Sequence, residues 1–319
     1  MKTGKKLFGT LIIPVTTLLV CMMISASKGI SLFDSSLSWT TFLRAMTNVV
    51  LVTFALSINL NSGRFDFSIG SIALLSSIIS SQITLRFGMG PVAMLLLSVL
   101  FGAALGFVSG TVYVITKLPP IIVSLAVALF YEGLSFTLTG GHGVSFANNG
   151  ELLSFGNMRN YIIISALALM LMIVVFDHTK FGYEYKALLS GQKVSVNTGI
   201  RETPNALICY TIAGMLMGVQ GFISATNNGS ITMSLNFGSI SPMFMAFLPM
   251  FIGGFIGRYS NDKLGYLLGA ISSALISLVY VRLNVSSSSQ QIISACLMVS
   301  FLIYLNNEEK LKSLFKKQG

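Results

Sequence analysis

The sequence predicts an all-α polytopic membrane protein with about ten transmembrane helices. Of its 319 residues, 53% are hydrophobic and only 9% are charged, whereas an ordinary soluble domain carries about a quarter charged residues. The apolar residues run in blocks of about 16–25, which suits membrane-spanning helices and not the alternating strands of an outer-membrane barrel. These observations exclude a cytosolic enzyme built from ordinary soluble domains.

Each apolar block is long enough to cross a bilayer as a helix. The first block follows three lysines, and we interpret it as an uncleaved anchor because it is longer than a signal-peptide core of about 7–15 residues. The ten expected spans are Leu7–Ser25, Thr40–Leu60, Ser68–Thr84, Pro91–Thr116, Pro119–Leu138, Tyr161–Phe176, Asn205–Ala225, Pro242–Ile256, Leu264–Val281 and Gln290–Leu305. The chain 1–319 is therefore expected to form a single transmembrane domain.

The basic residues predict the direction of the spans. With the N-terminus in the cytoplasm, ten spans place the C-terminal tail 306–319 and the loop 177–204 there as well. Fifteen of the 20 Lys and Arg residues then lie inside, as the positive-inside rule requires. The net charge of +10 therefore reflects topology, and we expect a lipid bilayer and no nucleic acid as the partner of this chain.

Two polar, glycine-containing segments interrupt the apolar pattern. The stretch Asn59–Ser71 separates the second and third spans, and Asn227–Ser241 precedes a short span that ends Ile252-Gly253-Gly254. Non-helical backbone at membrane depth is tolerated only where protein or a water-filled cavity surrounds it. Because the interruptions fall at similar places in the two halves, they predict two inverted repeats around a central pathway.

Glycines recur on one face of two expected helices. This spacing predicts close helix packing, since small residues let two backbones approach each other. The glycines of the fourth and seventh spans are Gly102, Gly106, Gly110, Gly214, Gly218 and Gly221.

Two carboxylates lie within or beside spans. A carboxylate at a helix centre costs roughly 2.5–3.5 kcal/mol on insertion scales, so Asp66 and Glu132 should face protein or water. Asp66 is also placed to cap the helix that starts near Ser68. The histidines and cysteines show no metal-ligand spacing, and no Walker motif or catalytic set is present. We therefore expect no metal, no cofactor in this chain and no enzymatic activity of its own.

The segment Ser62–Ser71 resembles the Gly-Gly-Ile-Asp-Leu-Ser-Val-Gly-Ser motif of a known family, the permease subunits of bacterial ATP-binding-cassette importers of the ribose, galactose and xylose type. Arg64 stands in place of a glycine. The segment Lys117–Leu125 is similar to the family's Pro-Pro-Phe-Ile-Val-Thr-Leu, and Glu132 follows where the family usually has Arg. The retained residues of the first motif are Asp66, Ser68, Gly70 and Ser71.

Two further matches support the resemblance. The loop from Gly182 to Ile200 has the length of the family's coupling loop, and Tyr210, Gly214, Gly221 and Ile252-Gly253-Gly254 match its later spans. The resemblance implies a substrate pathway that includes Asp66, Ser68, Gly70 and Glu132. It implies an ATPase coupling loop that includes Gly182, Ala187, Gly191, Gly199 and Ile200.

The resemblance also implies an assembly in a bacterial plasma membrane. This multi-pass chain would pair with a second permease copy, identical or different, with cytoplasmic ATPase subunits that bind the ATP, and with an extracytoplasmic substrate-binding protein. The solute would be small and polar, and a monosaccharide fits best. Two alternatives stay open: a nucleoside or amino-acid permease of the broader family, and a secondary transporter in which Asp66 or Glu132 couples an ion gradient.

Overall fold

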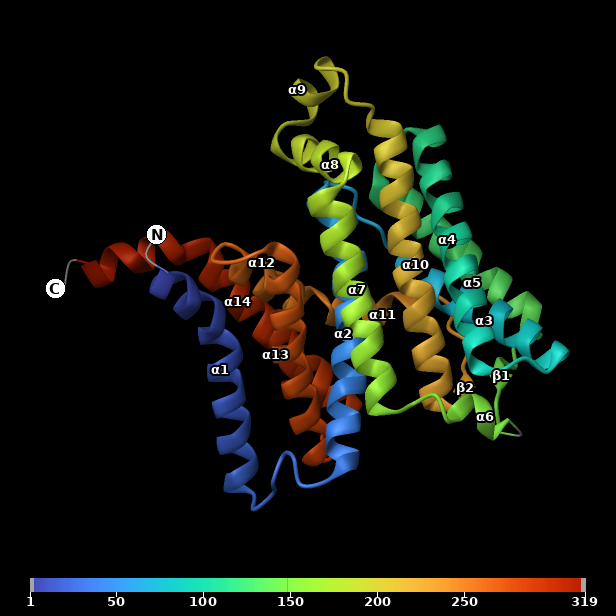
Figure 1. The fold of residues 1–319 in the computed structure, drawn as a ribbon, viewed down its shortest axis with the longest axis horizontal. Coiled ribbons are helices and arrows are strands. Elements are labelled where there is room, and N and C mark those ends of the chain that lie inside the picture. Colours follow the sequence, from blue (N-terminus) through green and yellow to red (C-terminus); the bar gives the residue numbers. More distant parts are fainter. Residues whose placement is uncertain (1–2, 148, 317–319) are drawn as a thin grey trace.

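The computed structural model describes residues 3–147 and 149–316, and helices make up most of the fold (Figure 1). Ten helical stretches in these residues are long and apolar enough to span a membrane, which confirms the predicted fold class. Nine of them are long helices: α1 (Thr3–Ser27), α2 (Ser36–Asn61), α3 (Ile69–Phe87), α4 (Pro91–Thr116), α5 (Pro120–Thr139), α7 (Met158–His178), α10 (Glu202–Asn228), α13 (Asp262–Arg282) and α14 (Ser287–Lys316).

The remaining span is broken into three pieces. It consists of the 3-10 turn η1 (Gly238–Ile240), α11 (Ser241–Met245) and α12 (Phe247–Gly257). The first predicted interruption is also present, because residues 62–68 between α2 and α3 are not helical. Both predicted interruptions of the apolar pattern are therefore confirmed, while the inverted-repeat relationship between the two halves stays a prediction.

Short elements occupy the two ends of the bundle. Between α7 and α10 lie α8 (Lys180–Ser190) and α9 (Gln192–Asn197), so the expected loop 177–204 is largely helical. The opposite end carries α6 (Gly150–Leu153) and a small antiparallel sheet of β1 (Val144–Ser145) and β2 (Ser230–Ile231) (Figure 1). The expected tail 306–319 continues α14 as far as Lys316, and 317–319 lie outside the described residues.

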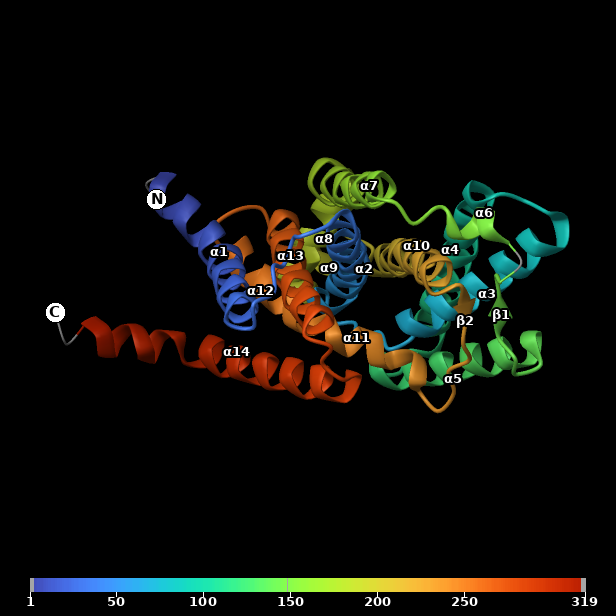
Figure 2. The same cartoon turned by 90° about the horizontal axis from the view of Figure 1, so that it is seen from below.

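The centre of the bundle is formed by α2 and α10. Helix α2 packs against α7, α10, α12 and α13, whereas α10 packs against α2, α3 and α4. In contrast, α1 and α14 lie at the margin (Figure 2), and no residue of the spanning part of α14 is buried. Their exposed apolar side chains fit contact with lipid, because a bilayer is as apolar as those side chains.

The contact between α4 and α10 is a backbone approach through glycines. A Cβ atom on Gly214 would lie 2.2 Å from the carbonyl oxygen of Gly102, and one on Gly106 would lie 2.4 Å from that of Tyr210. These distances leave no room for any side chain, so the predicted close packing of the two glycine faces is confirmed. The approach fixes the position of α10, whose C-terminal third lines the cavity described below.

Candidate functional site

The two interrupted segments meet at Gly70 and Ser239. A Cβ atom on Gly70 would lie 1.9 Å from the carbonyl oxygen of Ser239, so only glycine permits this contact between the start of α3 and η1. Aromatic rings extend the junction: Phe65 stacks on Phe247 at 5.6 Å between ring centroids, and Phe67 lies 6.1 Å from Phe244. Segments about 170 residues apart in the sequence thus form one structural unit.

A cavity of about 240 Å³ opens beside this junction. Its walls come from the first half of α3, the C-terminal third of α10 and residues 230–242. The lining is rich in hydroxyl and amide groups, and no charged side chain of the described residues lines it. Such a surface offers donors and acceptors to a neutral polar solute. The polar side chains on its walls include Ser77, Gln220, Ser224, Asn228, Ser234 and Ser239.

Asp66 lies behind the cavity wall, just before the start of α3. Its side chain is 2% exposed. One carboxylate oxygen accepts hydrogen bonds from the backbone N–H and the hydroxyl of Ser68, at 2.9 and 2.6 Å, and the other accepts one from the Asn59 amide at 3.1 Å. The positive end of the α3 dipole adds to the stabilisation of this anion. The carboxylate is thus held at the start of α3 as predicted, but the N-cap position is Ser68, and Asp66 stabilises the helix start through Ser68.

Ser68 continues this network away from the cavity. Its hydroxyl donates to Asp66 and lies 3.3 Å from the Ser109 hydroxyl on α4, which in turn lies 3.3 Å from the hydroxyl of Tyr131 on α5. Of the four predicted pathway residues, Gly70 lines the cavity, and the other three are buried around it. The network joins α3, α4 and α5 at the depth of the junction.

Glu132 on α5 fixes the other interrupted segment. It is 1% exposed. One carboxylate oxygen accepts the backbone N–H of Phe237 at 3.0 Å, and the other accepts the backbone N–H and the hydroxyl of Ser239 at 2.9 and 2.5 Å. Asn236 and Phe237 have φ values of 55° and 65°, which are unusual for residues other than glycine. The carboxylate therefore stabilises a strained turn whose far side, at Ser239, lines the cavity.

The region between α7 and α10 forms a compact helical pair, the α8–α9 segment. A Cβ atom on Gly182 would lie 2.4 Å from the carbonyl oxygen of Phe176, so α8 folds directly against the end of α7. The hydroxyl of Ser195 on α9 donates to the carbonyl oxygen of Ala187 on α8 at 2.8 Å. Gly199 has a φ of 96°, which favours glycine. The predicted coupling residues thus belong to one folded unit.

The α8–α9 segment lies at the end of the bundle, outside the membrane spans, and it exposes apolar side chains. More than 40% of the surface of each of four apolar residues is accessible. Exposed apolar side chains on a segment outside the spans are available for a protein contact. The four residues are Tyr183, Leu189, Val194 and Val196.

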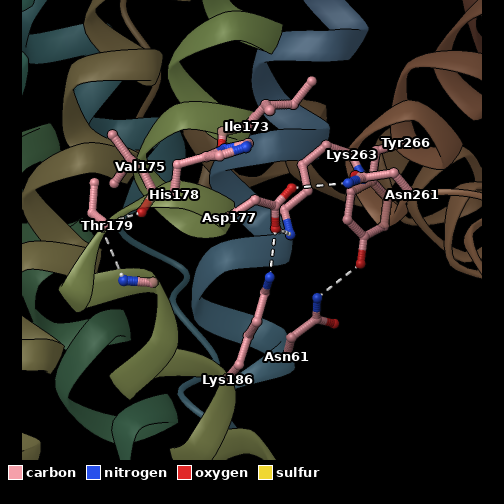
Figure 3. A network of polar contacts seen from close by, with 11 residues as sticks. Asn61, Ile173, Val175, Asp177, His178, Thr179, Lys186, Asn261, Lys263 and Tyr266 are labelled. Carbon is pink, nitrogen blue, oxygen red and sulfur yellow. Dashed lines mark hydrogen bonds and ion pairs between the residues drawn. The ribbon is translucent and has the colours of Figure 1, made fainter.

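A polar network connects this segment to the rest of the bundle (Figure 3). Asp177 at the end of α7 accepts hydrogen bonds from the ammonium groups of Lys186 on α8 and Lys263 on α13, at 2.7 and 2.8 Å. Its other oxygen accepts one at 2.9 Å from Asn261, which caps α13. Three helices therefore share one carboxylate.

A second connection leads from α8 toward the first interrupted segment. The hydroxyl of Tyr185 donates to the carbonyl oxygen of Ile58 on α2 at 2.8 Å. Three residues later on α2, the amide of Asn61 donates to the hydroxyl of Tyr266 on α13 at 2.8 Å (Figure 3). These contacts join α8 to α2 and α13 just before the chain reaches Asp66.

The family model described as "branched-chain amino acid transport system / permease component" matches residues 40–305. The chain belongs to this family. Together with the ten apolar helices, family membership identifies the chain as a multi-pass membrane protein of the permease type. The matched range includes both interrupted segments, the cavity and the α8–α9 segment.

Individual relatives share about a quarter of their aligned residues with this chain. The fructose import permease of Rhizobium meliloti is 25% identical over 84% of this chain and 76% of its own length. The ribose import permease of Bacillus subtilis is 28% identical over 60% and 61%. Among solved structures, a transporter described as of the metal-chelate ABC type, in an inward-facing conformation, shares the fold with a TM-score of 0.53 and 14% identity over 95% of this chain and 99% of that one.

Sequence reasoning missed the polar face of α10. Gln220, Ser224 and Asn228 line the cavity, and the amide of Gln220 donates to the hydroxyl of Ser224 at 2.8 Å. Their spacing of four residues places them on one helix face within an otherwise apolar block. That pattern was available in the sequence beside the glycine spacing of the same helix.

Proposed function

We propose that this chain is the membrane permease subunit of an ATP-binding-cassette importer of monosaccharides, and that the polar cavity is part of the translocation pathway. The observation that carries this proposal is the family match, combined with a neutral, hydroxyl-rich cavity at the junction of the two interrupted segments. A sugar presents many hydroxyls and no charge, so uncharged donors and acceptors suit it. Relatives named as fructose and ribose permeases support this class of solute.

The proposed assembly contains two permease chains, two cytoplasmic ATPase subunits and an external substrate-binding protein. Both termini and the α8–α9 segment face the cytoplasm of a bacterial cell, and β1, β2 and α6 face outside. The distribution of basic residues supports this orientation. The exposed apolar side chains of the α8–α9 segment are suited to contact the ATPase subunit, which supplies the ATP site.

In this proposal, ATP-driven closure of the ATPase pair displaces the α8–α9 segment. The Asp177 network transmits the displacement to α7 and α13, and the Tyr185 contact transmits it to α2. Two packings of the spans, open outward or inward, need differ by only a few kcal/mol for nucleotide and loaded binding protein to select between them. Weak solute contacts in the cavity favour release.

Reconstitution tests this function. Liposomes containing this chain, its ATPase partner and the binding protein are expected to take up fructose or ribose when ATP is supplied on the α8–α9 side, with no ion gradient. Omitting the ATPase partner is the control and should eliminate uptake. Uptake driven by an ion gradient through this chain alone would instead establish a secondary transporter.

Replacing Asp177 with alanine is expected to lower ATP-driven uptake about tenfold, the equivalent of about 1.4 kcal/mol. The change removes the shared acceptor and leaves the Lys263 side chain, 11% exposed, without its carboxylate partner. ATP hydrolysis should persist, because the ATPase site lies on another subunit. Initial rates of uptake and hydrolysis, measured side by side, show whether the two have become uncoupled.

Glu184→Ala is the matched control for Asp177→Ala. It removes the ion pair between the exposed Lys180 and the half-buried Glu184 within α8, and surface pairs of this kind contribute little. We expect uptake at the rate of the unmodified chain. Unchanged uptake in Asp177→Ala itself would show that this network does not transmit the movement.

A further inference from the structure

Arg64 is a buried cation that none of the roles described above uses. It lies in the first interrupted segment, and its side chain is 4% exposed. One terminal nitrogen of its guanidinium, Nη1, is enclosed and has no hydrogen-bond partner. In the part of the chain that the structure describes, no carboxylate lies within ion-pair distance of Arg64. Its contact is the thiol of Cys209 on α10.

The nearest carboxylate in the sequence does not balance this charge. Both oxygens of Asp66 accept hydrogen bonds from Ser68 and Asn59. Arginine keeps its proton in proteins, so the guanidinium cannot become neutral as a buried lysine can. A buried charge without a partner is strongly unfavourable. The arrangement therefore calls for an anion that is supplied from elsewhere.

A pocket beside Arg64 can accept such an anion. It has a volume of about 240 Å³ and lies between the first interrupted segment and the α8–α9 segment. Its lining combines the arginine with the polar residues Asn61, Ser62 and Gln192, and it includes no acidic side chain among the described residues. Since the related motif has a glycine where Arg64 stands, the cation is a feature of this chain and not of the motif.

We propose that the Arg64 pocket binds a small oxyanion, a phosphate or carboxylate group, next to the α8–α9 segment. The guanidinium supplies the positive charge that such a group requires. The Gln192 amide and the second N–H of the Asn61 amide remain as donors, whereas the Ser62 hydroxyl already donates to the carbonyl oxygens of Ile58 and Asn59. The anion is either free in solution or part of a transported solute. The assignment of this pocket to the cytoplasmic side rests on the proposed function, but the binding itself does not.

Calorimetric titration of inorganic phosphate onto the full chain in phosphatidylcholine nanodiscs tests this site. With chloride exchanged to keep the ionic strength constant, we expect saturable binding with a Kd of about 0.1–10 mM, the strength of a few charge-assisted hydrogen bonds. Arg64→Gln should weaken binding at least tenfold. Arg201→Gln is the matched control, because Arg201 is an exposed arginine at the same end of the molecule, and it should leave the Kd unchanged.

Absence of saturable phosphate binding to the unmodified chain overturns the proposal, as does equal binding by Arg64→Gln. The first of these is read on the native sequence, so it decides the matter even if a variant fails to fold. A sugar phosphate titrated in the same way distinguishes a free anion from the anionic group of a transported solute. Binding tenfold tighter than phosphate assigns the site to an anionic solute, whereas equal binding assigns it to a free anion. No transport is measured, so the result is independent of the importer function.

Discussion

Replacing Glu132 with alanine is expected to reduce uptake at least tenfold while the chain still inserts and folds. The change removes the acceptor of three hydrogen bonds and leaves the part-buried backbone N–H of Phe237 and the buried one of Ser239 without a partner. Each hydrogen bond to a charged group contributes about 1.5–3 kcal/mol. Without them, the turn with positive φ at Asn236 and Phe237 should relax and displace Ser239 from the cavity wall.

The measurement is the initial rate of sugar uptake over a range of concentrations of loaded binding protein. Glu132→Gln should lie between the alanine variant and the unmodified chain, since one amide oxygen still accepts a hydrogen bond while the amide nitrogen opposes a donor. Glu151→Ala is the control, because Glu151 is an exposed glutamate at the same end of the bundle. Normal uptake kinetics in Glu132→Ala would show that the position of the turn does not matter for transport.

The number of spans was predictable because it depends on local composition. A helix in a bilayer must satisfy its backbone polar groups by internal hydrogen bonds and present apolar side chains over about 20 residues. A single apolar block in the sequence shows that this requirement is met. All ten predicted spans are therefore found. The broken span of η1, α11 and α12 was predictable for the opposite reason. The polar residues Asn227–Ser241 that lead into it cannot form a continuous helix in lipid.

The partners of the buried carboxylates were predictable only when they were local. Asp66 bonds to Ser68, two residues away, and the capping pattern in the sequence predicts that contact. Glu132 bonds to Phe237 and Ser239, more than 100 residues away. No local pattern links a glutamate on one helix to backbone N–H groups in a distant turn, so its role required the three-dimensional arrangement.

The α8–α9 segment was expected as a loop, although local signals for a helix were present. Thr179 caps α8 by accepting the N–H of Gly182, and Phe181, Tyr185 and Leu188 recur at helical spacing. This pattern is short, and the charged residues between these positions give it the appearance of a solvated connection. Its inner face is buried because α2, α7 and α10 lie against it.

Replacing Asp66 with asparagine is expected to retain uptake within about twofold, whereas Asp66→Leu should lose at least tenfold. Asparagine keeps an oxygen for the N–H and hydroxyl of Ser68, and it is a comparably good cap. Its new amide nitrogen would oppose the amide of Asn59. A rotation of the Asn59 amide resolves this conflict, because its own oxygen is buried without a partner in the native arrangement and can then accept the hydrogen bond.

This pair of variants decides between the two transport classes. A proton-coupled transporter needs a carboxylate that gains and loses a proton in each cycle, so Asp66→Asn would abolish energised uptake and a protonophore would stop the unmodified chain. In an ATP-driven permease, Asp66 has only to accept hydrogen bonds at the start of α3, and asparagine suffices. Leucine fails in both cases, because it leaves the N–H of Ser68 and the amide of Asn59 without an acceptor. The measurement is uptake by liposomes with ATP and no ion gradient. If uptake is retained in Asp66→Asn and lost in Asp66→Leu, the carboxylate has a structural role in the pathway and the partner ATPase supplies the energy for transport.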